Sequence, residues 1–567
     1  MNLFTKAWLL LHIARWRMLW PFQNTRYSYT VPGNPKFMGP RDAVRACIRD
    51  GDLVGFSGLG GNQRPSIIYW AIRDLFLESG HPRDLHVLAI GGIGGRGRIP
   101  GTLEELGHAG LAKRLISGHL ETYKSFLKLA DQGQVEIQTL PQGTLAFLLA
   151  GQGDGRFSLT SKTGIGTFID PRGGRGSPVT DHRAEQLVSV EGDQLRYDLP
   201  PVNVAVFNAP AADREGNIYS TNCAMIAESR ELAKAARRNG GKVIVNVGRV
   251  VEKGGDEVLL PSHEVDAVVV WRRTEQAAGI EHRRYWPLFT THSDMPLDEA
   301  ISRVRFINTV LGITPRRTAA DSVLARLAAA IFAQHARKGS FVNIGVGLPE
   351  EVCRLMFEAG LLDQITLFTE SGVLGGVPAP GVFFGAAICP KRILSSAEIF
   401  RMCYERLDVA VVGALQVDSA GNVNVSRRGE GAINYVGPGG FIDLTTAARM
   451  VLFVSSWMDR ARIRLSNGNV RIEKPGKMKF VDRVDEVTFN GQEALKTGKV
   501  VFYVTHVGAF RLTPRGMELV NVMPGIDVRK DILEGSSMRV VLPESGRVPV
   551  VDRSIVTGEG FRLSLRE

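Results

Sequence analysis

The chain has 567 residues, which is too long for one ordinary hydrophobic core, so at least two large domains are expected. Apolar residues make up 44% of the sequence and charged residues 22%, which is ordinary globular usage and excludes the fibrous and disordered classes. The net charge is +11 at pH 7, but the basic residues are scattered and form no run interleaved with aromatic residues, which argues against a nucleic-acid partner.

The first twenty residues, MNLFTKAWLLLHIARWRMLW, are apolar and aromatic with basic residues between them and no acid. The stretch is too interrupted for a membrane-spanning helix, and no A-x-A cleavage signal follows it. Two interpretations stay open: a helix of residues 1–20 that lies on a membrane surface, or a dispensable extension or wrongly assigned start before the folded domains. On the second interpretation, deletion of residues 1–30 leaves the activity of the chain unchanged.

Strand patterns at 52–56, 85–90, 202–207 and 242–247 alternate with helix patterns, such as residues 231–241, which end in two glycines. Strands and helices in alternation predict parallel sheets covered on both faces. The glycine run GIGGRG at 92–97 matches G-x-G-x-x-G, but RIPGT follows it and no helix opens there, so we exclude a dinucleotide site.

The same order of elements then starts again. Residues 340–355 repeat the pattern of 52–68, residues 407–426 repeat 202–221 with its Asp-x-x-Gly-Asn turn, and residues 449–456 repeat 242–247. The sequence therefore predicts an α/β fold of two similar open, mainly parallel sheets related by internal duplication. The predicted parts are an apolar basic extension at 1–30, a first domain at 31–300, a linker at 301–318 and a second domain at 319–567.

Glu370 is the strongest catalytic candidate. It follows the strand pattern ITLFT and precedes the turn Ser371-Gly372, and the carboxyl ends of strands in open parallel sheets are where ligands bind. A glutamate with its free pKa of about 4.3 is ionised at neutral pH and needs no base to act as a nucleophile. A turn or helix-capping glutamate is the plain alternative.

Glycine turns at 57–61, 343–349 and 436–444 strengthen the catalytic interpretation, because glycine lets backbone N–H groups approach a developing oxyanion closely. The cysteines are odd in number, far apart and without a C-x-x-C pair, which predicts reduced thiols in the cytoplasm and neither a disulfide framework nor a zinc site. They are Cys47, Cys223, Cys353, Cys389 and Cys403.

The motifs TESGVLGGVPAPGVFFGA, AVVGALQVDSAGNVNVS and VGPGGFIDLTTAARMVLF resemble the C-terminal half of the family I coenzyme A transferases. GDLVGFSGLGG, LPQGTLAFLLAGQGDG, KTGIGTFIDPR and ADREGNIYSTN resemble the N-terminal half. The resemblance runs from about residue 38 to about residue 535, in the family's order. It is greatest to the single-chain branch typified by propionate CoA-transferase and acetate or 3-ketoacid CoA-transferases, which ends in a segment like MPGIDVRKDIL.

The resemblance implies an enzyme that moves CoA from an acyl-CoA to a free carboxylic acid, such as a short-chain fatty acid or 3-ketoacid. It implies ping-pong kinetics through a glutamyl-CoA thioester on Glu370. CoA is then a substrate and covalent intermediate, no metal or permanent cofactor is required, and the chain forms an even-numbered homo-oligomer, a dimer or tetramer.

The family's other site residues carry over to this sequence by position. Gln142 with Gly439 and Gly440 matches the oxyanion-binding groups, and Asn343 matches a polar neighbour of the glutamate. The alternatives are buried hydrogen-bonding roles for the two polar side chains and plain turns for the glycines. The glycine loops that would close the site contain Gly58, Gly60, Gly61, Gly345 and Gly347.

Some residues depart from the family pattern or have no assigned role. Asn62, Gln63 and Arg64 replace shorter or less charged residues; Arg64 is either a clamp for the acceptor carboxylate or, as we favour, a surface arginine. Tyr404, Glu405 and Arg406 replace a glycine run, so the resemblance does not define how the acyl pocket is assembled or which substrate it takes. Arg96 and Arg98 are either CoA-phosphate ligands or loop charges, and His119 is assigned a core or surface role.

Two rival functions stay open at this level. One is an acyl-CoA hydrolase on the same scaffold, and the other is a non-catalytic binding protein that kept the fold.

Overall fold

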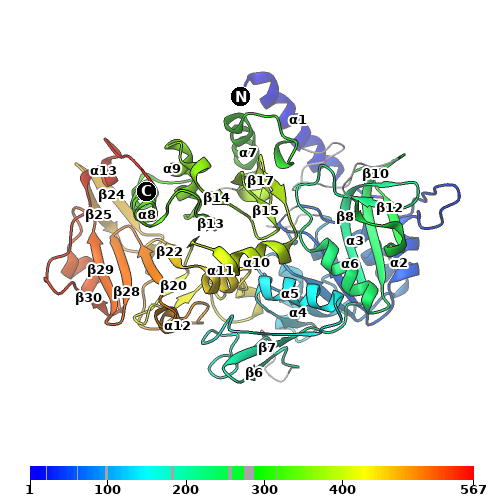
Figure 1. Ribbon diagram of the computed structural model, residues 1–567, viewed down its shortest axis with the longest axis horizontal. Helices are drawn as coiled ribbons and strands as arrows, with labels where there is room; N and C mark the ends of the chain where they lie inside the picture. Colours follow the sequence, from blue (N-terminus) through cyan, green and yellow to red (C-terminus); the bar gives the residue numbers. More distant parts are fainter. Residues whose placement is uncertain are drawn as a thin grey trace.

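The structure is a computed structural model that describes residues 1–20, 22–60, 62–95, 100–180, 184–252, 258–273, 287–313 and 316–566. Gly61, Arg96 and Arg98, singled out above, lie outside these residues. The two halves of the chain lie side by side along the long axis of the molecule, and each contains one large sheet (Figure 1).

The first sheet has nine strands and the order β11-β9-β8-β1-β2-β3-β4, with β10 between β8 and β12. Its strands are β1 (Leu53–Phe56), β2 (Leu85–Ala89), β3 (Ala112–Ser117), β4 (Glu136–Gln138), β8 (Val204–Asp213), β9 (Ile218–Tyr219), β10 (Lys242–Val251), β11 (Val258–Leu260) and β12 (Ala267–Val270). Successive residues of β1 face opposite clusters: Leu53 packs with α5 (Gln142–Gly153) and α6 (Ser229–Arg238), and Val54 packs with α2 (Pro40–Cys47) and α3 (Ser66–Ser79). The sheet is therefore covered on both faces, as its uninterrupted apolar strands predict.

The second sheet has eight strands, β14-β13-β19-β22-β27-β28-β29-β30. They are β13 (Phe341–Ile344), β14 (Thr366–Leu367), β19 (Val409–Val412), β22 (Met450–Val454), β27 (Val500–Val504), β28 (Gly508–Thr513), β29 (Gly516–Val522) and β30 (Val540–Val541). The main helices of this half are α8 (Ala319–His335), α9 (Glu350–Glu358), α10 (Ser396–Arg406), α11 (Phe441–Ala447), α12 (Gly491–Lys496) and α13 (Arg553–Thr557). Smaller hairpins, such as β24 (Arg462–Ser466) with β25 (Asn469–Lys474), lie at its outer end.

The duplication predicted from the sequence is visible in the strand order. Strands β2-β1-β8-β10-β12 of the first sheet are all parallel and correspond to β14-β13-β19-β22-β27 of the second, also all parallel. The repeated turns agree as well: Asp213 Oδ1 accepts the N–H of Asn217 at 3.0 Å, and Asp418 Oδ1 accepts the N–H of Asn422 at 2.9 Å. The fold class is thus two mainly parallel α/β sheets of matching topology.

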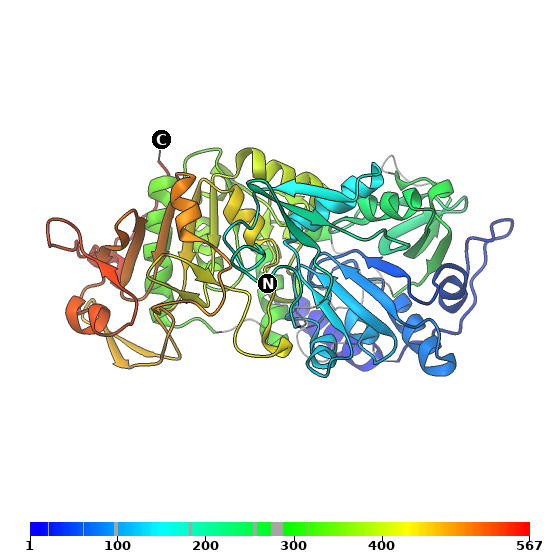
Figure 2. The same ribbon diagram turned by 90° about the horizontal axis from the view of Figure 1, so that it is seen from below.

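Helices α1 (Leu3–Leu19) and α7 (Leu297–Leu311) lie next to each other over the junction of the halves (Figures 1 and 2). Leu9 and Ile13 of α1 are buried in one cluster with Val304 and Ile307 of α7. The N-terminal segment is therefore packed on the body of the protein. Among the described residues, none of the helices combines the length and the apolar character that a bilayer crossing requires.

Candidate active site

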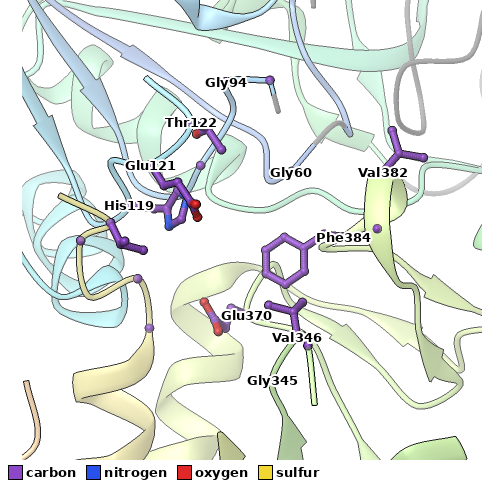
Figure 3. A pocket seen from close by; sticks show the side chains of 18 of the residues that line it. Gly60, Gly94, His119, Glu121, Thr122, Gly345, Val346, Glu370, Val382 and Phe384 are labelled. Carbon is purple, nitrogen blue, oxygen red and sulfur yellow. The ribbon is translucent and has the colours of Figure 1, made fainter. Parts of the chain in front are cut away.

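A cavity of about 1010 Å³ opens between the two halves, at the carboxyl ends of the parallel strands (Figure 3). Its volume is at the upper limit of the roughly 300–1,000 Å³ that small-molecule sites usually have. Both halves and α1 contribute to its wall. Of the predicted site residues, the lining includes Glu370, Asn343, Gly60, Gly345, Gly347, Gly439 and Gly440.

Glu370 is held by a tight turn directly after β14. The N–H of Thr369 donates to Val373 O at 2.9 Å, and the N–H of Gly372 donates to Thr369 O at 3.0 Å. Gly372 has φ +97°, which favours glycine, and a Cβ there would lie 2.0 Å from Leu394 O. The hydroxyl groups of Thr369 and Ser371 both donate to Gly385 O. The turn fixes the backbone on both sides of Glu370, and Figure 3 shows its carboxyl group at the cavity.

The environment of Glu370 raises the pKa of its carboxyl group to about 7, mainly through burial and secondly through the nearby Asp443, while an N–H hydrogen bond from Gly440 acts in the opposite direction. The expectation that this glutamate is fully ionised at neutral pH is therefore wrong, because its free pKa does not apply in this buried environment. Near pH 7 about half of the carboxyl groups carry a proton.

Asp443 is a buried carboxyl group that the sequence motifs did not single out, although it lies within VGPGGFIDL. It accepts hydrogen bonds from Gly143 N at 2.8 Å and Thr144 N at 3.0 Å, at the start of α5, and from the hydroxyl of Tyr404 at 3.2 Å. A carboxylate from the second half thereby satisfies the free N–H groups at the start of a helix of the first half. Burial raises the pKa of Asp443 to about 6, and these donors limit the rise.

The glycine turn at 437–440 joins Glu370 to the first half. The N–H of Gly439 donates to Gly118 O at 2.7 Å, and Gly439 O accepts the N–H of Gln142 at 2.9 Å. A Cβ at Gly440 would lie 2.7 Å from both Cδ and Oε2 of Glu370, so only glycine allows this approach. Gln142 itself is buried and is not among the residues of the cavity wall.

The glycine loop of the first half contacts the turn at 381–384 of the second. Gly60 has φ +63°, and a Cβ there would lie 2.1 Å from Phe384 O. The side-chain amide of Asn62 donates to the same oxygen at 2.8 Å. These contacts fix Phe384, which lines the same cavity as Glu370 (Figure 3). Gly58 is buried outside the wall, where its φ of +140° again favours glycine.

Known proteins of similar sequence identify the family to which this site belongs. Residues 37–270 match the family model described as Coenzyme A transferase. A caffeate CoA-transferase of Acetobacterium woodii is 33% identical over 510 residues, which cover 88% of this chain and 93% of that protein. The chain belongs to the coenzyme A transferase family. Acetate CoA-transferase YdiF of Escherichia coli K12 is 28% identical over 525 residues, covering 91% of this chain and 94% of that protein.

A solved structure shares the fold of this CoA transferase over nearly its whole length. The acyl-CoA transferase YdiF of E. coli O157:H7, described as a thioester complex with CoA, has a TM-score of 0.81 and 26% identity, and the match covers 95% of this chain and 100% of that one. The chain is therefore a CoA-transferring enzyme that uses CoA as a substrate and not as a permanently bound cofactor.

The structure corrects two interpretations of individual residues of the CoA transferase. Arg64 is not a surface arginine: its side chain is 1% exposed and belongs to the cavity wall. His119, assigned above to the core or the surface, also lines the cavity, next to Glu121 and Thr122 and across from Glu370 (Figure 3). Neither position is predictable from the local sequence, because both depend on how the two halves meet.

Tyr404, which stands where relatives tend to have a glycine run, has a structural position that its sequence did not suggest. Its hydroxyl lies 2.6 Å from Thr163 Oγ1 of the first half and donates to Asp443 of the second.

Among the residues that the structure describes, no group of three or more His, Cys, Asp or Glu side chains could hold a metal ion.

Proposed function

We propose that Glu370 is the nucleophile of a ping-pong CoA transfer. Its carboxylate oxygen attacks the thioester carbonyl of the donor acyl-CoA, and the C–S bond breaks to give an acyl-glutamyl anhydride and CoA thiolate. The thiolate attacks the glutamyl carbonyl, which releases the donor carboxylate and leaves a glutamyl-CoA thioester. An acceptor carboxylate reverses these steps and leaves as the new acyl-CoA. The observation that carries the proposal is the Glu370 carboxyl group in the cavity wall, in contact with the glycine turn at Gly440.

The donors around Glu370 support a role in stabilising the oxyanion of each tetrahedral intermediate. We assign this role to the turn of Gly439 and Gly440, with the Gly440 N–H as the donor directed at Glu370. Gly439, whose own N–H donates to Gly118 O, and Gln142 would hold this turn in place, and Asn343 would position the glutamate. Gln142 is buried directly behind the glycine turn, and Asn343 lies near the carboxyl end of β13 in the cavity wall.

Trapping of the intermediate tests the proposal. The enzyme is incubated with an acyl-CoA and no acceptor, reduced with borohydride, digested and analysed by mass spectrometry. We expect reduction of Glu370 to the alcohol, confined to the peptide that carries this residue. The Glu370→Gln variant should show neither the modification nor CoA exchange. A Gln variant that still exchanges CoA between acyl-CoA and free acid would exclude the mechanism.

The same incubation separates transfer from hydrolysis. When the acceptor acid is absent, a transferase releases about one donor carboxylate per site and keeps the CoA as the glutamyl thioester, whereas a hydrolase releases free CoA thiol continuously. The acceptor is a free carboxylic acid. The names of the relatives include acetate and caffeate, two acids of very different size.

The domain boundaries predicted from the sequence at 31–300 and 319–567 remain our proposal, with the active site between the two domains. Helix α7 (Leu297–Leu311) crosses the predicted start of the linker.

We propose that the enzyme acts in the cytoplasm as an even-numbered homo-oligomer. The five free cysteines support the location, and light scattering of the purified chain tests the number of subunits.

We further propose that the outer face of α1 lies against an anionic membrane surface. Leu3, Phe4, Leu11 and Met18 are exposed there, Lys6 and other basic residues lie nearby, and the helix has no acid in its first turn. Self-association through this face would bring like charges together. Flotation with vesicles containing phosphatidylglycerol, but not with neutral vesicles, is expected; dimerisation through α1 without flotation would contradict this proposal.

A further inference from the structure

The N-terminal helix α1 forms part of the wall of the Glu370 cavity. Trp16, Arg17 and Trp20 all line it. Trp20 is anchored, because its indole N–H donates to Pro100 O at 2.7 Å and its ring packs against Trp70 and Trp271, each with a centroid distance of 5.3 Å. Trp16 stacks on Trp20 at 5.9 Å. The end of α1 next to the cavity is therefore rigidly placed, unlike a dispensable extension.

Apolar contacts connect this helix to the neighbourhood of Glu370. Leu9 and Ile13, on the inner face of α1, share one cluster with α7 and with Phe383. Val382, Phe384 and Leu311 pack against the same cluster, and all three also line the cavity. Apolar groups of the cavity wall thus pack against the cluster that joins α7 to α1. Trp16 itself is buried in the neighbouring cluster with Trp20 and lines the same wall.

Polar side chains line other parts of the described wall, among them Arg64 and, next to Trp16, Arg17. Figure 3 places His119, Glu121 and Thr122 on one side of Glu370, and Val382 and Phe384 on the other. An acyl-CoA has a polar and an apolar end on the two sides of its thioester. The apolar side of the cavity suits the hydrocarbon part of the acyl group, because burial of each methylene there is favourable.

We propose that Trp16 is a specificity-determining residue, which forms the end wall of the acyl site and sets the largest apolar acyl group that the enzyme accepts. The inference rests on the proposed function, because the thioester must reach Glu370. A flat, rigid indole at the end of an apolar site rewards each added methylene until the chain meets the ring, and a longer chain then forces repacking. The N-terminal helix is thereby part of the catalytic unit.

The test is a chain-length profile of kcat/KM with straight-chain acyl-CoAs from acetyl-CoA to dodecanoyl-CoA and one fixed acceptor. For the wild-type enzyme we expect a rise of up to about fourfold per methylene, then a steep fall. Trp16→Ala should move the fall to longer chains, with a gain of about tenfold or more for the first acyl group that the wild type rejects.

Trp8→Ala is the matched control. Trp8 lies two turns before Trp16 on the same helix, is 48% exposed, stacks on His12 at 5.3 Å and does not line the cavity. Its replacement should leave the chain-length profile unchanged. If Trp16→Ala proves unstable, Leu311→Ala removes another apolar group of the same wall from α7 and should shift the profile in the same direction.

The outcomes separate this inference from the proposed function. A gain with long acyl-CoAs in Trp16→Ala supports the inference, since loss of structure cannot produce it. A folded Trp16→Ala enzyme with the wild-type profile, or a wild-type enzyme without a chain-length limit, overturns it. Retention of exchange in Glu370→Gln would instead overturn the proposed function, whatever the profile shows.

Discussion

Replacement of Glu370 by glutamine should stabilise the folded enzyme at neutral and higher pH while it abolishes CoA transfer. The site raises the pKa of this carboxyl group from its ordinary value near 4.5 to about 7. At about 1.4 kcal/mol per pKa unit, the ionised glutamate lowers the unfolding free energy by up to about 3.5 kcal/mol, and neutral glutamine of similar shape avoids this loss.

The sign of the pH dependence follows from the proton balance. Between pH 4.5 and 7 the folded enzyme keeps the Glu370 proton and the unfolded chain loses it. The contribution of the protonated group to stability is therefore complete below pH 4.5 and is lost as the pH rises to 7. The two proteins should be almost equally stable near pH 4.5, and the difference should reach its full value above pH 7. Asp443 is present in both, so its own titration largely cancels.

Urea unfolding followed by tryptophan fluorescence, at pH values from 5 to 8, measures this difference. The matched control is Glu358→Gln, at an exposed glutamate in the last turn of α9, whose unfolding free energy should follow that of the wild type at each pH to within about 0.5 kcal/mol. A Glu370→Gln effect that is the same at pH 5 and pH 8, or a variant less stable than the wild type at pH 8, would refute the reasoning, because the carboxyl group would then carry no raised pKa.

Three further predictions concern the same cavity and α1. The rate of transfer should fall about tenfold for each pH unit below 7, because only ionised Glu370 attacks. Asp443→Asn removes a neighbouring negative charge and should move this acidic limb of the pH–rate profile to lower pH, and an unshifted limb in a folded variant would show that Asp443 does not act on Glu370. Gly440→Ala should lower kcat by about 100-fold with little change in Tm, because the new Cβ would displace the Glu370 carboxyl group. Gly413→Ala, in the same wall but with open space around its Cβ, should retain activity, and equal activities of the two variants would exclude the steric argument. Trp20→Ala should cost about 3–5 kcal/mol of unfolding free energy, measured in urea, because its side chain is 2% exposed; a cost below about 1 kcal/mol would mean that the end of α1 does not pack on the core in solution.

The contacts that α1 makes with the body of the protein revise the expectation that residues 1–30 are dispensable. The sequence of this segment shows only that it is apolar and basic, and such a composition fits a free helix equally well. Its contacts with Trp70, Trp271 and α7 come from residues 50 to 300 positions away in the chain. We now expect deletion of the segment to lower the stability of the protein and, because Trp16 is removed with it, to move the chain-length limit to longer acyl-CoAs.

Local sequence predicted most of the fold because local physics determines it. Apolar strand runs, helix patterns and the Asp-x-x-Gly-Asn turns at Asp213 and Asp418 specify elements over fewer than twenty residues, and the repeat of these patterns predicted the matching strand orders. Glu370 was a candidate for the same reason: a carboxylate next to a strand end and a glycine turn stands out in the chain.

The properties of the site depend on contacts between distant parts of the chain. Asp443 and Thr144 are about 300 positions apart, yet their hydrogen bond joins the halves beside Glu370, and the proximity of Asp443 contributes to the raised pKa of that glutamate. Sequence by itself determined the duplicated α/β fold and a nucleophile candidate, because hydrophobic periodicity and turn chemistry act over short distances. Only the tertiary structure decided the protonation of Glu370, the burial of Arg64 and the place of α1, because electrostatics and packing act between groups that folding brings together.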